Sequence, residues 1–443
     1  MNSILEIPEI AGLDARRGLV RIPPELDVPL TDRVRQIIDT AEFRRLAKIS
    51  QLGLVSLVYP AAIHTRFEHS LGVYRLALLF LKRLAHDERF AAALRPEDAE
   101  LFLVTALLHD LGHWPFCHPI EDIHLPSVPT HELFANSFVL EGEVGDVLRD
   151  QWHINPRDVV ALLNEKPRTV ASRILASMLS GPIDIDKIDY LFRDSLHAGV
   201  PYGRNFDQPR LIGSLCLNAA GNGLAITDKG KTAAELLVFA RYVMFSEVYW
   251  HHGVRAATAM LHRAFYLLHG MLHLDSLFRM TEGQWIEELQ QVAGAGPARD
   301  LLGGIFGPTR QLYKRLLQYS LFEEQELYLR LARRPYPWLA ACAEQFAGLA
   351  STALGRVVAP HEILFDAPPV QREVEIEVDV FYPKENRYRP LAEVSPVVRT
   401  LAKEQFDDYV KRVRIFAHPR IAAELRRLNE LPKLVSQAIE RTE

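Results

Sequence analysis

The chain has 443 residues and a formal net charge of −5, and hydrophobic residues make up 48% of it. This length exceeds what one hydrophobic core usually organises, so we expect a large domain with smaller appended parts. The balance of apolar and charged residues excludes a disordered chain and a membrane-embedded one. A slightly acidic chain has no global attraction for nucleic acid, so phosphate binding would require local basic clusters.

The cysteines limit which metal ligands are available, and the apolar segments and first residues indicate the cellular location. Cys117, Cys216 and Cys342 lie far apart and offer neither a disulfide framework nor a thiolate zinc site. Any metal is therefore expected to use His and carboxylate ligands. Apolar runs such as Leu101–Leu108 are too short to span a membrane, and Met1–Gly12 lacks a signal-peptide pattern. We expect a cytoplasmic protein with no membrane partner.

The first half of the chain predicts helices. After an N-terminal extension over residues 1–31, apolar residues recur at three- and four-residue spacing from Asp32 to Arg173. Residues 217–230 place Asn and Gly between two small apolar runs, which predicts a hairpin. Helices are expected again from Lys231 to about Leu349.

The pattern changes after Pro360. Residues 374–381 alternate apolar and acidic side chains with the two-residue period of a strand, and residues 409–417 loosely repeat this period with basic residues. We therefore predict a mainly α fold with a helical domain over residues 32–350 and a small α/β lobe over residues 351–443.

Histidine and aspartate are concentrated in a few short stretches. These stretches are His64–His69, His109–His118, His131–Glu132 and Asp184–Lys187. A His followed at once by Asp, after the apolar helix predicted over residues 101–108, places two metal-competent groups where a helix ends. Imidazole nitrogen and carboxylate oxygen together suit Fe, Mn, Zn or Mg. A single such His is more often a core or surface residue, but the ordered set favours a metal site.

The order of these residues resembles a known family. Four of them form an H…HD…D pattern, namely His69, His109, Asp110 and Asp186. With the wider stretches 64–73, 107–118 and 183–194, the chain resembles HD-domain phosphohydrolases. Within them it is similar to the deoxynucleoside triphosphate triphosphohydrolase branch, which includes the animal SAM-and-HD-domain enzyme and bacterial relatives. The resemblance implies a helical HD-domain core and hydrolysis of dNTPs to deoxynucleoside and inorganic triphosphate.

The resemblance also implies a divalent metal ion, which could be Mg, Mn, Fe, Zn or Ni, held by His69, His109, Asp110 and Asp186. Two imidazoles and two carboxylates leave open positions on an ion that can polarise a phosphate oxygen and lower the pKa of water. The alternative for Asp186 is a helix N-cap.

Catalytic groups are implied next to the metal. The resemblance assigns the acid and its orienting group to His113, His118, Glu121 and His131. Histidine suits the task because its ordinary pKa is near the working pH, while a carboxylate partner fixes the tautomer. His113 follows His109 by four residues, so we expect the two on one helix face. The chain departs from the animal relative at Glu121, where that relative has Asp, which puts the exact His–carboxylate pairing in doubt.

Basic and aromatic residues are candidates for holding the triphosphate. They are Arg66, Lys187, Tyr190 and Arg241. Asp186, Tyr190 and Asp194 recur at four-residue intervals, which places them on one face of one predicted helix beside Lys187.

A second stripe is predicted on one later helix, formed by Arg241, Phe245, Tyr249 and His252. The resemblance implies that Arg241 binds phosphate and Tyr249 stacks on the sugar. It also implies that Gln51 and Leu52 lie against the deoxyribose and that Asp194 bonds the 3′-hydroxyl. The alternative is an amphipathic core helix whose Arg reaches solvent.

Regulation and assembly are less determined. The stretch after Asp39 has Ala47 where the animal relative has a basic residue, and residues 13–24 also differ from the pattern of that relative. We therefore do not assign the nucleotide-activator site of the animal relative to this chain. A homo-oligomer, dimer or tetramer, is expected. Whether an allosteric nucleotide also binds is left open by the sequence.

Two other functions compete with dNTP hydrolysis. One is an HD phosphohydrolase or phosphodiesterase for another nucleotide or single-stranded nucleic acid, and the other is a non-catalytic nucleotide-sensing or binding module. Arg-rich helices predicted within residues 310–334 could attract single-stranded nucleic acid, although a solvated face is the favoured interpretation.

Overall fold

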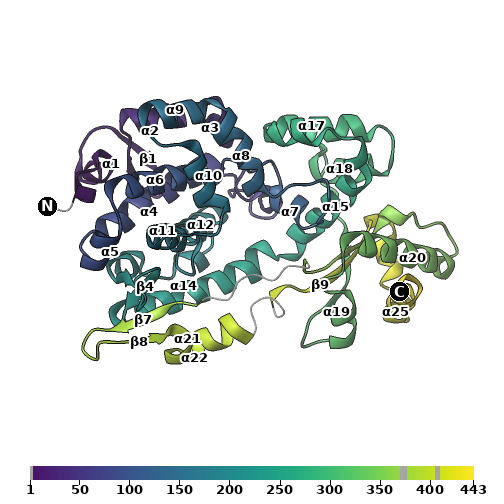
Figure 1. Cartoon of the computed structure of the whole chain (residues 1–443). Helices are drawn as coiled ribbons and strands as arrows, with labels where there is room; N and C mark the ends of the chain where they lie inside the picture. The colour runs from purple at the N-terminus through teal and green to yellow at the C-terminus, as the bar shows by residue number, and fades with distance from the viewer. Residues whose placement is uncertain (1–2, 370–376, 405–409) are drawn as a thin grey trace.

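The computed structural model describes residues 3–369, 377–404 and 410–443 and confirms a mainly α fold (Figure 1). A helical body holds the larger hydrophobic core and a smaller lobe holds a second one. The longer described helices of the body are α4 (Arg66–Leu84), α6 (Pro96–Leu108), α8 (His131–Glu141), α9 (Glu143–Gln151), α10 (Pro156–Asn164), α11 (Val170–Ser180), α12 (Ile185–Ala198), α14 (Lys231–Met244), α15 (His252–Leu268), α17 (Glu282–Ala293) and α18 (Pro297–Phe306).

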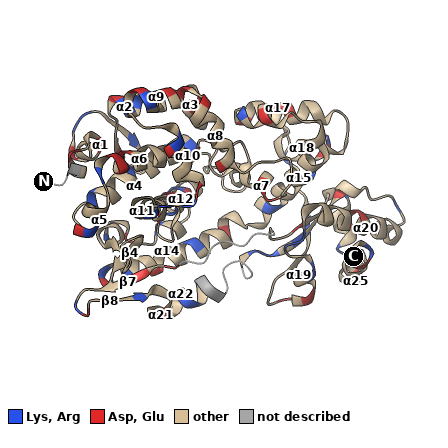
Figure 2. Ribbon diagram, viewed as in Figure 1, with Lys and Arg blue, Asp and Glu red and all other residues tan. Residues whose placement is uncertain are grey.

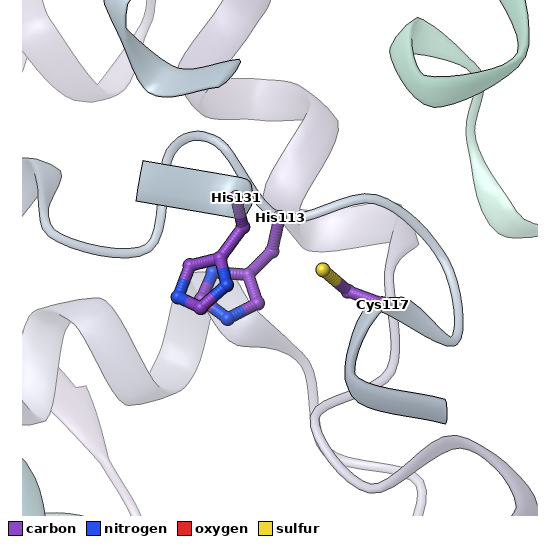
Figure 3. A group of neighbouring side chains, drawn as sticks. All are labelled: His113, Cys117 and His131. Carbon is purple, nitrogen blue, oxygen red and sulfur yellow. The ribbon is translucent and has the colours of Figure 1, made fainter. Parts of the chain in front are cut away.

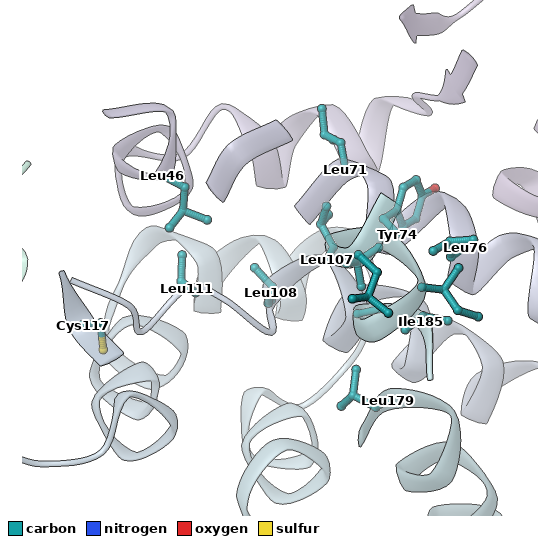
Figure 4. Close-up of a cluster of buried hydrophobic side chains, with 14 of the residues drawn as sticks. Leu46, Leu71, Tyr74, Leu76, Leu107, Leu108, Leu111, Cys117, Leu179 and Ile185 are labelled. Atoms are coloured by element: carbon teal, nitrogen blue, oxygen red, sulfur yellow. The ribbon is translucent and has the colours of Figure 1, made fainter. Parts of the chain in front are cut away.

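Helices α4, α6 and α12 pack together at the centre of the body. Side chains of α4 such as Leu71 and Tyr74 lie near Leu107 and Leu108 of α6, and Ile185 of α12 lies near them (Figure 4). All five residues are almost fully buried, as the three- and four-residue spacing predicted. Because the three helices share one core, the polar residues at their ends are brought to one place.

The N-terminal extension packs against the body. Its hairpin of β1 (Leu19–Ile22) and β2 (Leu26–Pro29) follows the short helix α1 (Pro8–Ala11). Glu9 in that helix is buried and accepts two hydrogen bonds from the guanidinium of Arg33, at 2.8 Å and 2.5 Å. This ion pair joins the extension to helix α2 (Asp32–Ile38).

The predicted hairpin near residues 217–230 is confirmed as β3 (Leu215–Leu217) and β4 (Leu224–Thr227), which pair antiparallel. Two later strands extend this sheet in the order β3-β4-β7-β8. They are β7 (Asp379–Tyr382) and β8 (Arg387–Pro390). The strand expected over residues 374–381 lies partly outside the described residues. Its end forms β7, which pairs parallel with β4 of the body instead of joining the lobe.

The lobe contains a three-stranded antiparallel sheet in the order β5-β9-β6. Its strands are β5 (Lys314–Tyr319), β6 (Ile363–Asp366) and β9 (Val413–Ala417), and α20 (Tyr336–Leu354) and α25 (Leu431–Thr442) complete its core. In Figure 1, α20 and α25 lie together at one end of the molecule. Strand β9 falls within the predicted 409–417, of which residue 409 lies outside the described residues.

The prediction of helices across residues 310–334 is wrong in part. Only α19 (Gln325–Leu331) is helical there, because β5 pairs along its length with β9, a segment about one hundred residues later in the chain. Tertiary pairing overrides the local pattern at β5. The domain boundary near residue 350 stays a prediction.

Lys and Arg residues and Asp and Glu residues are both scattered over the helices of the body (Figure 2). Among the described residues, no helix combines the length and apolar character that a membrane crossing needs.

Candidate active site

Three helices deliver the four predicted metal ligands to one point. His69 lies in α4, His109 follows the last residue of α6, and Asp186 lies in the first turn of α12. The two Nε2 atoms of His69 and His109 are 3.2 Å apart, and Asp186 Oδ1 is 3.0 Å from His69 Nε2. Asp110 Oδ1 lies 3.4 Å from His109 Nε2. Two imidazoles and two carboxylates thus converge.

The orientation of both rings fits a metal. His69 Nδ1 lies 2.9 Å from Asp189 Oδ2, and His109 Nδ1 lies 2.9 Å from the carbonyl oxygen of Ala106. With Nδ1–H donated to these acceptors, each Nε2 is directed into the cluster, which is the orientation of a metal-ligating histidine. The donor atoms of His69, His109 and Asp186 lie within 4.8 Å of one another. The residues therefore fit a divalent cation.

The carboxylates supply the negative charge that a cation would neutralise. Burial lowers the pKa of His69, but hydrogen bonds to Asp186 and Asp189 outweigh burial and raise that pKa to about 10. Burial raises the pKa of Asp110, but the surrounding histidines and the guanidinium of Arg66 hold it well below its usual range. Asp110 is therefore ionised at neutral pH.

Asp186 is not the helix N-cap, which was the alternative interpretation. Asp184 caps α12 by accepting from the backbone N–H of Lys187 at 2.6 Å. The same carboxylate accepts from Lys187 Nζ at 2.7 Å. Asp186 is thereby left to face the two histidines, and Lys187 is held beside it by Asp184.

The four predicted catalytic residues form a second cluster. His131 Nδ1 lies 2.9 Å from Glu121 Oε1, and His118 Nδ1 lies 3.5 Å from Glu121 Oε2. The rings of His113 and His131 have centroids 3.8 Å apart (Figure 3). The longer side chain of Glu121 thus reaches both neighbouring histidines.

The prediction that His109 and His113 share one helix face is wrong. Helix α6 ends at Leu108, and a turn separates it from His113. His113 still reaches the metal cluster because its Nδ1 lies 3.1 Å from Asp110 Oδ1. The turn, which includes Gly112 packed against the start of α8, brings the ring back towards Asp110.

The environments of His113 and His131 push their pKa values apart. Burial and the nearby guanidinium of Arg66 hold the pKa of His113 well below its ordinary value. Burial lowers the pKa of His131 too, but the hydrogen bond to Glu121 and the charge of that carboxylate outweigh it and raise that pKa. Two imidazoles of different basicity therefore lie side by side, an arrangement that separates acid from base roles.

A network of hydrogen-bonded polar side chains surrounds Asp194, nearer the C-terminal end of α12. Tyr249 donates its hydroxyl to Asp194 Oδ2 at 2.6 Å, and His64 Nε2 lies 3.0 Å from Asp194 Oδ1. The backbone N–H of Gln51 donates to the carbonyl of His64 at 2.9 Å. Gln51 Oε1 is buried without a hydrogen-bond partner among the described residues. Leu52 follows it and is half-buried.

The predicted phosphate-binding residues have different surroundings. Arg66 is buried and donates to Asp110 Oδ2 at 2.7 Å. Tyr190 lies on α12 with its ring 6.5 Å from that of Tyr249. Arg241 is buried in the last turn of α14.

The residues predicted to form a stripe on one helix, Arg241, Phe245, Tyr249 and His252, do not lie on one helix. Helix α14 ends at Met244, a π-helical turn spans Phe245–Tyr249, and α15 begins at His252. The wider π turn changes the spacing of 3.6 residues that the prediction assumed.

Sequence reasoning missed several supporting residues. Asp189 accepts from His69 and forms an ion pair with Arg193 at 2.8 Å, and Arg193 also reaches Glu68 at 2.6 Å. The spacing of Asp189 from Asp186, three residues on a helix, was the available signal. His64 was counted in the dense stretch but not given its role beside Asp194.

Comparison with known families agrees with this geometry. The model of the HD domain matches residues 66–191, and that of the HD associated region matches residues 206–430, about half of the chain. The chain belongs to the HD-domain phosphohydrolase superfamily. The four predicted metal ligands all lie within the segment matched as HD domain.

Several curated proteins are similar over large parts of the chain. An uncharacterized protein of Methanocaldococcus jannaschii is 32% identical over 312 residues, covering 67% of this chain and 59% of that protein. The deoxynucleoside triphosphate triphosphohydrolase SAMHD1 of Gallus gallus is 28% identical over 331 residues, covering 63% of this chain and 53% of that protein. The chain thus matches little more than half the length of these curated relatives.

A solved structure matches this HD-domain protein almost end to end. The crystal structure of a hypothetical protein from Aquifex aeolicus superposes with a TM-score of 0.70 and 27% sequence identity. It covers 92% of this chain and 98% of that one. The fold, lobe included, is therefore shared with a protein of similar extent.

Proposed function

We propose that this protein hydrolyses deoxynucleoside triphosphates to deoxynucleoside and inorganic triphosphate. The observation that supports this best is the pair of adjoining clusters, one fit for a divalent cation and one in which Glu121 contacts His131 and raises its pKa. The name of the chicken relative, a deoxynucleoside triphosphate triphosphohydrolase, gives the substrate class. A bound divalent metal would supply Lewis-acid activation at phosphorus and a water of lowered pKa.

The residues of the second cluster have distinct roles in this proposal. His131, held by Glu121, donates a proton to the departing 5′-oxygen, and His113 remains neutral beside it. His118, whose side chain is 60% exposed, lies at the open side of the cluster. Arg66, Lys187 and Arg241 neutralise charge on the phosphates.

The network of polar side chains around Asp194 is proposed to hold the sugar. Asp194 accepts the 3′-hydroxyl, Tyr249 stacks beside the ring and fixes the carboxylate, and Tyr190 lies next to it. The unpartnered Oε1 of Gln51 is an acceptor that a sugar hydroxyl would satisfy, which supports the assignment. Leu52 would occupy the space that a 2′-hydroxyl needs.

Product analysis tests the reaction. The purified protein is incubated with each dNTP, the rNTPs and a single-stranded oligonucleotide, in Mg²⁺, Mn²⁺ or Fe²⁺. Deoxynucleoside plus intact triphosphate is the expected result. Cleavage of the other substrates without triphosphate release would favour another HD phosphohydrolase, and no turnover with any of them would favour a binding module.

The role of Glu121 has its own test. In Glu121→Gln the carboxylate that raises the pKa of His131 is lost, so the alkaline limb of the kcat profile should move to lower pH while metal content is unchanged. An unchanged profile would remove His131 from the role of acid.

A nucleotide effector is part of the proposal because of a basic cavity. This cavity has a volume of about 880 Å³ and lies where α15 meets the lobe. Its cationic lining residues are Arg310, Lys314, Arg315 and Arg426, with His252 beside them, and none of the described residues that line it is acidic. Activation of one dNTP's turnover by a second dNTP, lost in Lys314→Ala, would support an effector site there.

Association into a dimer or tetramer is also proposed. Large apolar side chains such as Phe322 and Met271 are exposed on the isolated chain, which favours burial against another copy. Sedimentation of the purified protein, with and without dNTP, measures this directly.

A further inference from the structure

The fold brings a cysteine next to two histidines of the second cluster. Cys117 is the first residue of the short helix α7 (Cys117–Glu121), and it is almost fully buried. Metal-donor atoms of His113, Cys117 and His131 all lie within 4.8 Å of one another. In Figure 3 the sulfur of Cys117 is directed towards the imidazoles of His113 and His131. The sequence alone predicted a metal held by His and carboxylates without any thiolate.

We propose that His113, Cys117 and His131 form a second metal site that takes Zn²⁺ or a comparable thiophilic divalent ion. This goes beyond the metal of the HD signature, which uses His69, His109, Asp110 and Asp186. Occupation of the second site withdraws two histidines from proton transfer and therefore inhibits hydrolysis. That regulatory consequence rests on the proposed function, whereas metal binding itself does not.

The surroundings of the three donors fit this assignment. His113 directs Nδ1 to Asp110 at 3.1 Å, which leaves Nε2 for a metal. A carboxylate on the other nitrogen is the usual arrangement of zinc-ligating histidines. His118 and Glu121 form a further potential ligand group with His131, so a fourth ligand is within reach. Zn–S and Zn–N distances require the donors to approach by about 1 Å.

The two sites differ in the ions they favour. The first combines two imidazoles with two carboxylates, which suits Mg²⁺, Mn²⁺ or Fe²⁺. The second combines two imidazoles with a thiolate, which suits Zn²⁺ and Co²⁺ and not Mg²⁺. Burial raises the pKa of the Cys117 thiol well above its ordinary value. The ion must therefore displace the thiol proton into solvent as the metal–sulfur bond forms, and binding strengthens as pH rises.

Cobalt binding tests the site without reference to activity. The full chain, loaded with Mn²⁺, is titrated with Co²⁺, and thiolate-to-cobalt charge-transfer absorption is recorded. We expect this band in the wild type and its loss in Cys117→Ser and in Cys117→Ala. Cys216→Ser and Cys342→Ser are matched controls, because both residues are also buried free cysteines and should keep the band. Absence of the band in the wild type, or its persistence in both Cys117 variants, would overturn the site.

Zinc inhibition tests the consequence. With Mn²⁺ present, Cys117→Ser should hydrolyse dNTP at the wild-type rate but need at least about tenfold more Zn²⁺ for half-inhibition. Equal zinc sensitivity in Cys117→Ser and wild type would overturn the inhibitory role. A Cys117-dependent cobalt band in a protein that turns over no dNTP would support the metal site and contradict the proposed function.

Discussion

Asp189 fixes the ring of His69 by accepting from its Nδ1 at 2.9 Å, one turn of α12 beyond the predicted metal ligand Asp186. The carboxylate of Asp189 is itself held by Arg193 through two hydrogen bonds of 2.8 Å. One helix thus supplies both a predicted metal ligand and the group that orients a second one. We therefore expect the metal affinity of His69 to depend on Asp189, which is not itself one of the predicted ligands.

Replacing Asp189 by Asn should weaken metal binding by roughly 10- to 100-fold, because the amide no longer fixes the Nδ1–H tautomer of His69 as a carboxylate does. Metal content after dialysis, measured with turnover, checks this. Asp275→Asn is the control, because Asp275 forms the same i,i+4 pair with Arg279 on the surface. Wild-type metal content in Asp189→Asn would show that Asp189 has no part in orienting the ligand.

Gly72 allows α4 to approach this ion pair. A Cβ on Gly72 would overlap Oδ1 of Asp189 and the guanidinium of Arg193. We expect Gly72→Ala to lower the free energy of unfolding by about 2 kcal/mol and to reduce metal content. In contrast, Gly348→Ala in α20, where a Cβ meets no atom within 4 Å, should raise stability by about 1 kcal/mol. Denaturant unfolding measures the free energy of unfolding of both variants. Equal stabilities of the two variants would contradict the packing argument.

The hydroxyl of Tyr249 should matter for the substrate more than for the fold. Tyr249→Phe removes the 2.6 Å hydrogen bond to Asp194, while His64 still holds that carboxylate. Loss of one such bond, about 1 kcal/mol, predicts a roughly fivefold fall in kcat/KM for dNTP. Tyr388→Phe loses a hydrogen bond to Leu217 in the β3-β4-β7-β8 sheet and should leave kcat/KM unchanged. Equal effects in the two variants would assign Tyr249 a structural role only.

His262 should make the fold sensitive to acid. It is buried in α15, and burial lowers its pKa from 6.5 to about 3. The unfolded chain then binds a proton below pH 6.5 that the folded chain does not, so stability falls as pH decreases from 6.5 towards 3. Between pH 7 and pH 5 this group alone removes about 2 kcal/mol.

Unfolding free energies of His262→Gln at these two pH values check the prediction, since the variant should lose about that much of the acid dependence. His86→Gln, at an exposed position, serves as control. An acid dependence identical to that of the wild type would mean that His262 is not the responsible group.

Local patterns accounted for much of the fold. The spacing of apolar residues gave α4, and the four-residue spacing of Asp186, Tyr190 and Asp194 gave α12. Asn and Gly between short apolar runs gave the β3–β4 hairpin. The turn after Leu108 and the π-helical turn at Phe245–Tyr249 were not visible, because each departs from the regular helical period on which the prediction rests.

The sequence by itself determined that the chain belongs with metal-dependent HD proteins, because His69, His109, Asp110 and Asp186 carry ligand chemistry in an ordered pattern. Only the tertiary structure decided which groups surround them. Asp189 orients His69, and Cys117 faces His113, because α4, α6, α7 and α12 pack around one core. Such neighbours depend on distances between segments far apart in the chain, and residue spacing along one element does not encode them.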